Sequence, residues 1–453
     1  MKKLFGTDGI RGEAGTFPLD PATVRVIGAS LTRRLSERNS SAPRIVIGRD
    51  TRESGSWIEQ ALVAGAGEAG ADVQSAGIIT TPGVAFLTRT LPAEAGVVIS
   101  ASHNPYHDNG IKVFEPSGRK LDDAMERLIE KDIANAGRPA PPEESISLDA
   151  TGAGDLRVRY VDYLTNDIGK GLSLANLKIV VDCANGAAYE IAPEVLRRLG
   201  ANVVAINNQP NGRNINLNAG SLHIESLQAR VIADRADIGV AFDGDADRAL
   251  FVDAEGNFVD GDAALWVLAI FLKARNELSD DTVVATVMSN IGLELALKSQ
   301  GLSLVRTDVG DKYVLDELLR RGSALGGEQS GHIIFPKISL AGDGIITSLM
   351  LLRVMAQAQR SLAELTSGFQ RYPQLLVNVR VREKRPFEEL PSVQDTARQI
   401  QEKLDGHGRL LLRYSGTEPL ARVMIEGESA EQIRIYAEEL ANVIRRELGS
   451  EQS

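Results

Sequence analysis

The stretch Ile-Gly-Val-Ala-Phe-Asp-Gly-Asp-Ala-Asp-Arg, residues 238–248, joins an apolar run to an acidic loop. A short apolar run bounded by turn residues predicts a buried strand, here over 238–242. Asp243, Asp245 and Asp247 follow at every second position, with only Gly and Ala between them. Three carboxylates that converge without a cation would repel one another strongly. The stretch therefore predicts a buried strand whose following loop binds a divalent metal ion.

Oxygen ligands without a neighbouring His or Cys favour Mg²⁺ over zinc or copper at this loop. The rival interpretation is a calcium EF-hand, which requires Gly at the sixth loop position and Glu at the twelfth. Arg248 and Ala254 occupy those positions, so the EF-hand is excluded. A solvated turn without a metal ion remains the alternative.

Outward from this stretch, strand and helix patterns alternate as far as Tyr372-Pro373, which is typical of an α/β layer fold. We expect strands at 44–48, 177–181, 203–206, 238–242 and 283–287, and helices at 57–69 and, after the N-cap pair Asp20-Pro21, at 21–38. Beyond Pro373 we expect strands at 375–381, 410–412 and 423–426 and helices at 392–404 and 430–447. This last part is typical of a small α+β domain.

A second strand-to-loop unit carries hydroxyl groups. The apolar run 95–99 leads into Ser100-Ala101-Ser102-His103-Asn104-Pro105, where the Asn-Pro pair favours a turn. A small hydroxyl on a tight loop is well placed to act as a nucleophile, although Ser and Asn are also ordinary turn formers. There is no Gly-x-Ser-x-Gly motif, and adjacent side chains rarely point at each other, so we expect no Ser–His hydrolase pair at 102–103. His103 and His107 are expected to be turn or surface residues.

Two more loops follow expected strands. Ser323–Leu325 is expected to be a strand that leads into Gly-Gly-Glu-Gln-Ser-Gly-His at 326–332. The stretch Leu-Leu-Leu-Arg-Tyr-Ser-Gly-Thr-Glu-Pro at 410–419 offers an Arg, two hydroxyl groups and a Gly, which together can bind a phosphate. Each stretch taken alone also fits a polar surface loop.

Taken together, the loops at 100–105, 243–248, 327–332 and 413–419 resemble the four signature loops of the α-D-phosphohexomutases, in this order and at these spacings. The resemblance covers nearly the whole chain. Residues 5–12 (Phe-Gly-Thr-Asp-Gly-Ile-Arg-Gly), residues 309–314 and Gln329 are most similar to the members that act on glucosamine phosphate.

The resemblance implies three similar α/β domains with mixed sheets and a C-terminal α+β domain like the TATA-binding protein, around a central cleft. The chain length of 453 residues agrees with three or four domains. We expect boundaries that give domains at 1–150, 151–255, 256–368 and 369–453, the first in the Pro- and Gly-bearing stretch 137–154. A hinge is expected near Ser367-Gly368.

The resemblance also implies the chemistry. Ser102 would carry a phosphoryl group, and one Mg²⁺ held by Asp243, Asp245 and Asp247 would also contact that phosphoserine. The other implied roles are proton handling by Lys112, Arg11 and His332, stabilisation of the transferring phosphoryl group by Arg248, binding of sugar hydroxyls by Glu328 and Ser330, and binding of the second phosphate by Arg413, Ser415, Gly416 and Thr417. Glucosamine 6-phosphate would become glucosamine 1-phosphate through glucosamine 1,6-bisphosphate, supplying UDP-N-acetylglucosamine synthesis.

The composition limits the kinds of partner that we expect the protein to bind and the cellular compartment in which we expect it. A formal net charge of −11 argues against nucleic acid and anionic membranes as partners. No apolar run approaches the roughly 20 residues of a membrane span, and Gly6 to Gly9 interrupt any signal peptide. The single cysteine, Cys183, is expected to be a buried, inert thiol in a reducing compartment, so we expect a cytoplasmic protein. The sequence leaves open whether it forms a homodimer.

Several functions remain open at this stage. A phosphomannomutase or phosphoglucomutase of the same family would carry the same four loops. A Mg²⁺-dependent serine phosphatase would need Ser102 and the acids but not the phosphate loop at Arg413. A non-catalytic sugar-phosphate sensor would need that loop but neither Ser102 nor the acids.

Overall fold

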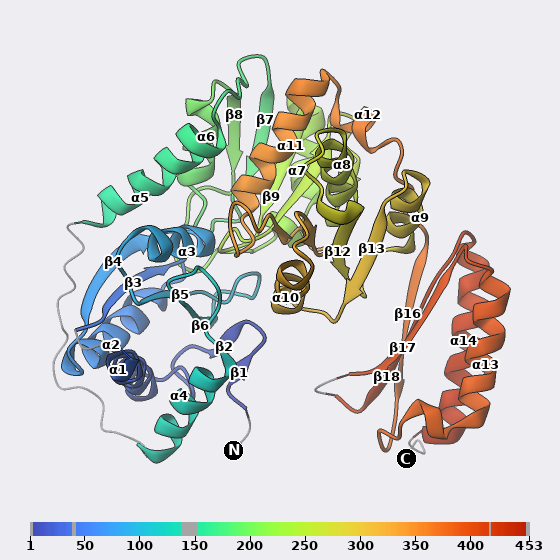
Figure 1. Ribbon diagram of the computed structural model, residues 1–453, viewed down its shortest axis with the longest axis horizontal. Coiled ribbons are helices and arrows are strands. Elements are labelled where there is room, and N and C mark those ends of the chain that lie inside the picture. The colour runs from blue at the N-terminus through green and yellow to red at the C-terminus, as the bar shows by residue number, and fades with distance from the viewer. Residues whose placement is uncertain (1–2, 39–41, 137–151, 416–417, 450–453) are drawn as a thin grey trace. The chain divides into compact units, whose positions relative to one another are not determined.

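The computed structural model describes residues 3–38, 42–136, 152–415 and 418–449 (Figure 1). The chain divides into two compact units, one formed by Met1–Met288 and Val305–Ser367 and the other by Ser289–Leu304 and Gly368–Ser453. One division therefore falls between Ser367 and Gly368, where the sequence predicts a hinge. The expected domain boundary at 137–154 lies almost entirely outside the described residues.

The first unit begins with a six-stranded mixed sheet in the order β1-β2-β6-β5-β3-β4. Its strands are β1 (Phe5–Gly6), β2 (Gly9–Glu13), β3 (Arg44–Arg49), β4 (Asp72–Ile78), β5 (Ala95–Ile99) and β6 (Asp108–Phe114). Its helices are α1 (Pro21–Arg38), α2 (Gly55–Glu68), α3 (Thr81–Thr90) and α4 (Asp123–Asn135). Apolar residues of α1, α2 and α4 form one buried cluster with alternate residues of β3, β5 and β6. The helices predicted at 21–38 and 57–69 are confirmed to within two residues.

The second sheet of this unit has five strands in the order β11-β10-β9-β7-β8, with β7 parallel to β8 and β9 and with β10 antiparallel to its neighbours. The strands are β7 (Lys178–Asp182), β8 (Asn202–Ile206), β9 (Ile238–Phe242), β10 (Ala249–Asp253) and β11 (Phe258–Val259). The helical elements are α5 (Ala153–Asp162), the π-helix η1 (Tyr163–Ile168), α6 (Ile191–Arg198), the 3-10 helix η2 (Gly220–Leu222) and α7 (Glu225–Asp234). The strand predicted at 238–242 is confirmed residue for residue.

The third sheet has four strands in the order β13-β12-β14-β15. They are β12 (Thr282–Thr286), β13 (Ser303–Thr307), β14 (Gly326–Gly327) and β15 (Ile333–Ile334), and the accompanying helices are α8 (Gly261–Ala274), η3 (Ser279–Asp281), α10 (Asp311–Arg321), α11 (Gly344–Ala358) and α12 (Leu362–Thr366). The position predicted for a strand at Ser323–Leu325 is wrong, because the observed strand, β14, begins three residues later, at Gly326. The regular pairing with β12 starts at Gly326, where a Cβ would lie only 2.7 Å from the carbonyl oxygen of Val284, so this close approach requires glycine.

The second unit contains α9 (Ile291–Ser299) and an antiparallel sheet in the order β16-β18-β17. Its remaining elements are β16 (Gln374–Arg380), η4 (Phe387–Glu389), α13 (Pro391–Leu404), β17 (Arg409–Tyr414), β18 (Leu420–Glu426) and α14 (Ala430–Leu448). Figure 1 shows α13 and α14 together on one face of this sheet, where their apolar residues form a single core with the strands. The predicted α+β segment is confirmed, but Arg413 lies within β17 rather than in the loop that follows.

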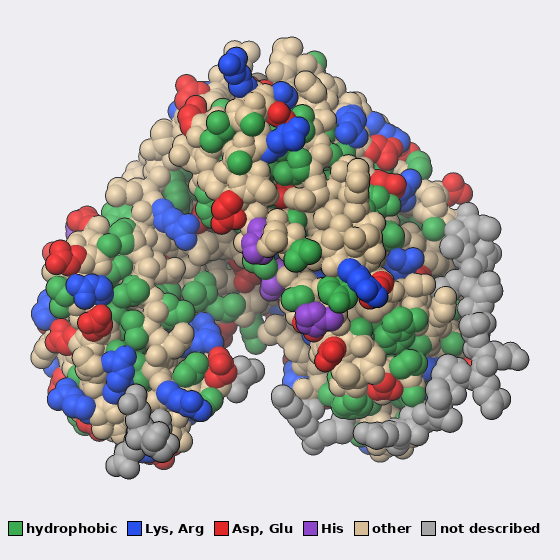
Figure 2. All heavy atoms as spheres, turned by 180° about the vertical axis from the view of Figure 1, so that it is seen from behind, with side chains coloured by type: hydrophobic (Ala, Val, Ile, Leu, Met, Phe, Trp, Pro, Cys, Tyr) green, Lys and Arg blue, Asp and Glu red, His purple; other side chains and the backbone are tan. Residues whose placement is uncertain are grey.

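Charged residues are dispersed over the surface. Figure 2 shows acidic and basic side chains intermixed on one face of the protein. No helix among the described residues is both long and apolar enough to cross a membrane. Cys183 is buried and free, and burial raises the pKa of its thiol well above the ordinary value, which suppresses the reactive thiolate.

Candidate active site

Ser102 lies just beyond β5, on the loop that the sequence singles out. Its side chain is fully buried, and its φ of 52° is in the left-handed region that non-glycine residues rarely adopt. The Ser102 hydroxyl donates a hydrogen bond of 2.6 Å to Asp243 Oδ2. His103 Nδ1 also lies 3.2 Å from Ser102 Oγ, so the expectation that these adjacent side chains do not meet is wrong. Burial and the neighbouring Arg248 and Arg11 lower the pKa of His103 to about 4, which keeps its imidazole neutral near pH 7.

The three acids occupy the turn between β9 and β10. Each of Asp243, Asp245 and Asp247 is buried and offers one carboxylate oxygen, and these oxygens all lie within 4.8 Å of one another. Ala246 lies between the second and third acid with a φ of 58°, which turns the chain so that the alternate side chains converge. The convergence predicted from the Asp-x-Asp-x-Asp spacing is therefore present.

Lys112 on β6 is the principal cation next to the acids. Its ammonium lies 2.8 Å from Asp245 Oδ2, 3.0 Å from Asp8 Oδ2 and 3.5 Å from Asp247 Oδ2. Burial alone would lower the pKa of Lys112, but the three carboxylates outweigh it and hold the pKa well above the ordinary value. Lys112 is thus an ammonium in this arrangement.

Three other predicted residues surround the same acids. His332 Nδ1 lies 3.6 Å from Asp247, and although burial opposes the charged form, Asp247 raises the pKa of His332 to about 9. Arg248 follows the acids directly, with its guanidinium 3.8 Å from Asp247 and its backbone N–H donating to Asp243 Oδ1 at 3.2 Å. Arg11 on β2 forms an ion pair with Asp8, the carboxylate that also contacts Lys112.

A divalent cation fits these donors. Burial, followed by the charges of Asp247 and Asp245, raises the pKa of Asp243 well above its ordinary value. The three carboxylates therefore repel one another in this buried arrangement, and a bound divalent cation would relieve that repulsion. Asp245 Oδ1 is buried and has no hydrogen-bond partner among the described residues. An orphaned carboxylate oxygen beside two other carboxylates and a serine hydroxyl is the donor set that a hard, oxygen-seeking ion prefers.

The predicted sugar-binding residues lie on the tight turn after β14. Glu328 is partly buried, and its carboxylate accepts a hydrogen bond of 3.2 Å from the backbone N–H of Gly310. Ser330 is also partly buried. Between them, Gln329 donates to the buried Asp262 at 3.0 Å, which fixes the turn against the start of α8. The backbone carbonyl of Gly331, on the same turn, accepts a hydrogen bond of 3.1 Å from the backbone N–H of Ala249, which places this turn beside the end of the acidic loop.

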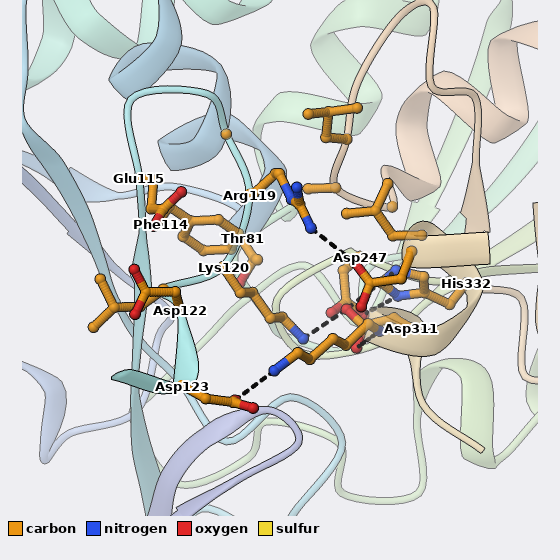
Figure 3. A pocket seen from close by; sticks show the side chains of 18 residues that line it. Thr81, Phe114, Glu115, Arg119, Lys120, Asp122, Asp123, Asp247, Asp311 and His332 are labelled. Atoms are coloured by element: carbon orange, nitrogen blue, oxygen red, sulfur yellow. Dashed lines mark hydrogen bonds and ion pairs between the residues drawn. The ribbon is translucent and has the colours of Figure 1, made fainter. Parts of the chain in front are cut away.

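A cavity of about 350 Å³ reaches Asp247 and His332 from the side of α10 (Figure 3). Figure 3 shows charged pairs that cross this cavity from the segment after β6 to α10. Lys120 pairs with Asp311 at 2.6 Å and with Asp8 at 2.5 Å, and Asp311 in turn lies 3.7 Å from His332 Nε2. A chain of charges therefore links α10 to the acidic loop at Asp247.

The predicted phosphate-binding residues belong to the second unit. Arg413 lies on β17 directly opposite Arg422 of β18, and the buried Ser415 follows β17. Ser415 Oγ accepts a hydrogen bond of 3.3 Å from Arg422, and the Lys384 ammonium donates to the Ser415 backbone carbonyl. The predicted ligands Gly416 and Thr417 lie outside the described residues.

Sequence reasoning assigned no role to several residues that contact the predicted site. They are Asp8, which bridges Lys112, Lys120 and Arg11; Thr81, whose hydroxyl donates to Asp245; Asp311, beside His332; and Arg422 and Lys384, beside Ser415. Asp8 lies within the Gly-Thr-Asp-Gly run that carried part of the resemblance, so that motif was a usable signal. Thr81 had no such signal in the sequence, because its contact with Asp245 joins residues that are 164 positions apart.

The chain matches four family models in succession. Residues 2–139, 158–256 and 260–372 match the alpha/beta/alpha domains I, II and III of phosphoglucomutase/phosphomannomutase, and residues 376–443 match its C-terminal domain. The chain therefore belongs to the phosphoglucomutase/phosphomannomutase family of phosphoryl-transferring isomerases. The resemblance to the α-D-phosphohexomutases and the expected fold class are both confirmed.

Full-length relatives carry a more particular name. The chain is 52% identical over 448 residues to a phosphoglucosamine mutase of Solibacter usitatus, covering 99% of both chains. It is 47% identical to a phosphoglucosamine mutase of Desulfovibrio desulfuricans, covering 98% of this chain and 99% of the relative.

Solved structures share the fold. A phosphoglucomutase/phosphomannomutase family protein of Burkholderia thailandensis superposes with a TM-score of 0.80 at 23% identity, covering 98% of each chain. An Aspergillus fumigatus N-acetylphosphoglucosamine mutase, solved with GlcNAc-6P and magnesium, gives a TM-score of 0.67 at 20% identity, covering 98% of this chain and 95% of that one.

Proposed function

We propose that the protein interconverts glucosamine 6-phosphate and glucosamine 1-phosphate by passing a phosphoryl group through Ser102. The observation that carries this proposal is the buried Ser102 hydroxyl, hydrogen-bonded at 2.6 Å to one of three converging carboxylates. The two relatives at 52% and 47% identity, both phosphoglucosamine mutases, support the choice of sugar.

Asp243, Asp245 and Asp247, together with the oxygen on Ser102, would hold one Mg²⁺. When bound, the ion withdraws charge from the phosphoryl group on Ser102 and so favours its transfer. The guanidinium of Arg248, adjacent to Asp247, stabilises the negative charge of the group in transit.

The proton balance sets the roles of Lys112, Arg11 and His332. As the bond from phosphorus to Ser102 Oγ breaks, a sugar hydroxyl forms the new bond to phosphorus, and its proton must in net terms reach Ser102. Lys112 starts this step as an ammonium, because the carboxylates raise its pKa, so it is suited to protonate the departing oxygen. Arg11 keeps Asp8 in place beside Lys112, and His332 provides a second titratable group at the acids.

The substrate is held at two ends in this proposal. Glu328 and Ser330 bind sugar hydroxyls, and Arg413, Ser415, Gly416 and Thr417 bind the phosphate that is not reacting. Glucosamine 1,6-bisphosphate forms after the first transfer and turns end for end before its other phosphate returns to Ser102. Arg413 and Arg422 stand directly opposite each other on neighbouring strands, so two cationic side chains are available to a bound phosphate dianion.

The domain assignments follow the same proposal. Domain I at 1–150 carries the phosphoserine loop, domain II at 151–255 the metal loop, domain III at 256–368 the sugar loop and domain IV at 369–453 the phosphate loop. The substrate is a small sugar phosphate, the acidic protein binds no nucleic acid, and the enzyme acts in the cytoplasm.

Coupled assays with glucosamine, glucose and mannose 1-phosphates at matched Mg²⁺ and bisphosphate concentrations test the sugar preference. We expect kcat/KM for glucosamine 1-phosphate to exceed the others by roughly 10² to 10⁴, because buried acceptors for the ammonium stay unpaired with the other sugars. Equal or better turnover of glucose or mannose phosphate would instead support a phosphoglucomutase or phosphomannomutase.

A further inference from the structure

The backbone around Ser102 is held by two side chains that the chemistry does not use. Arg52 Nη2 donates to the carbonyl oxygens of Ser102 and Asn104 at 3.1 and 2.6 Å. Asn216 Nδ2 donates to the same two oxygens at 2.8 and 3.0 Å. Two buried groups thus use four hydrogen bonds to fix the peptide units on both sides of the turn.

Arg52 is itself fixed by a closed network of polar groups. The fully buried Asp50 pairs with the Arg52 guanidinium and accepts the Arg52 backbone N–H at 2.9 Å. Asp50 Oδ2 also accepts the Ser100 hydroxyl at 2.5 Å, and Ser100 Oγ accepts the Ser102 backbone N–H at 2.9 Å. The network therefore controls both the N–H and the C=O of Ser102.

Asn216 reaches Ser102 from the loop between β8 and η2, which belongs to the sheet that carries the acids. Its backbone N–H donates to the Ala184 carbonyl at 2.9 Å, so it is anchored to that sheet. Gly244, between two of the acids, lies so close to Ser102 that a Cβ would stand 2.4 Å from the Ser102 carbonyl oxygen and 3.0 Å from Asn216 Nδ2. Asn216 thus ties the Ser102 loop to the loop that follows β7 of the second sheet, at a point next to Gly244 of the acidic loop.

We propose that Arg52 and Asn216 are positioning residues for phosphoryl transfer: they clamp the carbonyls of Ser102 and Asn104 and so hold the Ser102 oxygen in register with the Asp243 loop. A left-handed φ at a serine is maintained only where the surroundings over-determine it, and these four hydrogen bonds provide that constraint. Displacement of a reacting atom by about 1 Å costs about 10²-fold in rate. The inference rests on the proposed function, because it assumes that Ser102 carries the phosphoryl group.

Asn216→Gly is the sharpest test, because Gly tolerates the positive φ of 57° while the side chain and its amide are removed. Asn218→Gly is its matched control, since Asn218 is exposed on the same loop and also has a positive φ, of 50°. Each protein is charged with glucose 1,6-bisphosphate and mixed with glucosamine 6-phosphate, and loss of the phosphoryl group from Ser102 is timed by intact-protein mass spectrometry. Arg52→Lys, which keeps the charge but not the two-pronged contact, is measured in parallel.

We expect Asn216→Gly to slow the transfer by about 10- to 10²-fold with KM for the sugar and Mg²⁺ affinity unchanged, and Asn218→Gly to match the wild type. Transfer at the wild-type rate in both Asn216→Gly and Arg52→Lys overturns the inference. So does loss of the fold in both variants, because the contacts would then serve stability alone. If the wild type itself passes no phosphate to the sugar, the proposed function fails instead.

Discussion

The hydrogen bond from Ser102 to Asp243 joins two loops that are 141 positions apart in sequence. Each loop follows a buried strand, β5 in one sheet and β9 in another, and each contains a residue with positive φ that turns the chain sharply. The position of Ser102 relative to the acids therefore depends on the packing of two sheets rather than on either loop alone. Variants of the two loops should fail in the same chemical step.

Ser102→Ala should remove the phosphoryl acceptor. We expect no phosphate on the peptide that contains residue 102 and a loss of mutase activity of at least about 10³-fold, because alanine has no hydroxyl to carry the phosphoryl group. Ser117→Ala, at an exposed serine, is the control and should keep both phosphate and activity. Phosphate retained elsewhere with full activity would show that another residue is the nucleophile.

Asp245→Asn should weaken metal binding with little effect on the fold, since Asn keeps the shape and can still contact Thr81. We expect Mg²⁺ affinity to fall at least about 10-fold and kcat about 10²-fold, as for loss of a charged metal ligand. Isothermal titration with Mg²⁺ and a steady-state assay measure the two effects. Glu255→Gln, at an exposed acid on the following hairpin, should change neither. Unchanged Mg²⁺ affinity in Asp245→Asn would be incompatible with the proposed ligand set.

Local sequence predicted the strands and the chemistry of the loops that follow them. The apolar run 238–242 was recognisable as a strand because it is short and is bounded by turn-forming residues, which distinguishes it from a buried helix. The spacing of Asp243, Asp245 and Asp247 likewise carries its own consequence, since repulsion among converging carboxylates requires a nearby positive charge. The strand at 238–242 and the convergence of the three acids are confirmed, and both predictions used fewer than about ten residues of local sequence.

Long-range contacts could not be derived in the same way. Thr81 meets Asp245, and Asn216 meets Ser102, across more than a hundred positions, and no local pattern distinguishes them from other Thr or Asn residues. The protonation state of Lys112 could not be predicted from the sequence either, because its pKa depends on the positions of Asp245, Asp8 and Asp247 around it in the fold. The His103 contact was missed since the left-handed turn at Ser102 is a feature of the fold and not of the motif.

Asp343 caps α11 and should make stability depend on pH in an unusual direction. Burial raises its pKa to about 6, although hydrogen bonds from Tyr160 and the backbone N–H groups of Ile346 and Ile345 oppose the rise. Because the folded-state pKa is above the ordinary 3.8, its stabilising contribution is complete below pH 3.8 and is lost as pH rises through 6. At pH 7 this loss amounts to about 3 kcal/mol.

Asp343→Asn keeps a capping oxygen but cannot ionise, so it should be more stable than the wild type at pH 8, by up to about 3 kcal/mol, with a smaller gain at pH 5. Asp122, the N-cap of α4, is the contrasting case: the hydrogen bond from the Met125 backbone N–H lowers its pKa, so it stabilises the fold above pH 3.8. Asp122→Asn should therefore lose stability at pH 8. Urea unfolding from pH 5 to 8 compares the two, and a pH-independent effect in Asp343→Asn would refute the assignment.

Lys120 and Lys312 line the same cavity in Figure 3 but differ in burial. The Lys120 side chain is 19% exposed and bridges Asp8 and Asp311, whereas that of Lys312 is 33% exposed and pairs with Asp123, itself 50% exposed. Lys120→Met removes one of the three cations beside Asp8 and the cation nearest to Asp311, so we expect a loss of about 1 to 3 kcal/mol in unfolding free energy. Lys312→Met should lose at most about 1 kcal/mol. Equal losses in urea unfolding would mean that the Lys120 bridge is no stronger than a surface pair.

Arg413 decides between the mutase and the phosphatase, because only the mutase needs to hold a second phosphate. The side chain lies opposite Arg422 on β18, and the two cations gain from a shared anion. Since binding at the distant phosphate positions the reacting end, Arg413→Ala should raise KM and lower kcat, with kcat/KM reduced by about 10² or more. Arg413→Lys keeps the charge but not the paired donors, so its kcat/KM should lie between those of Arg413→Ala and the wild type. Arg434→Ala, at an exposed position of α14 in the same domain, should leave the kinetics unchanged.

The rate at which water hydrolyses the phosphoserine is measured in the same variants. The phosphatase alternative predicts that Arg413→Ala hydrolyses its phosphoserine as fast as the wild type and turns over sugar phosphate at an unaltered rate. That pair of results would exclude the mutase.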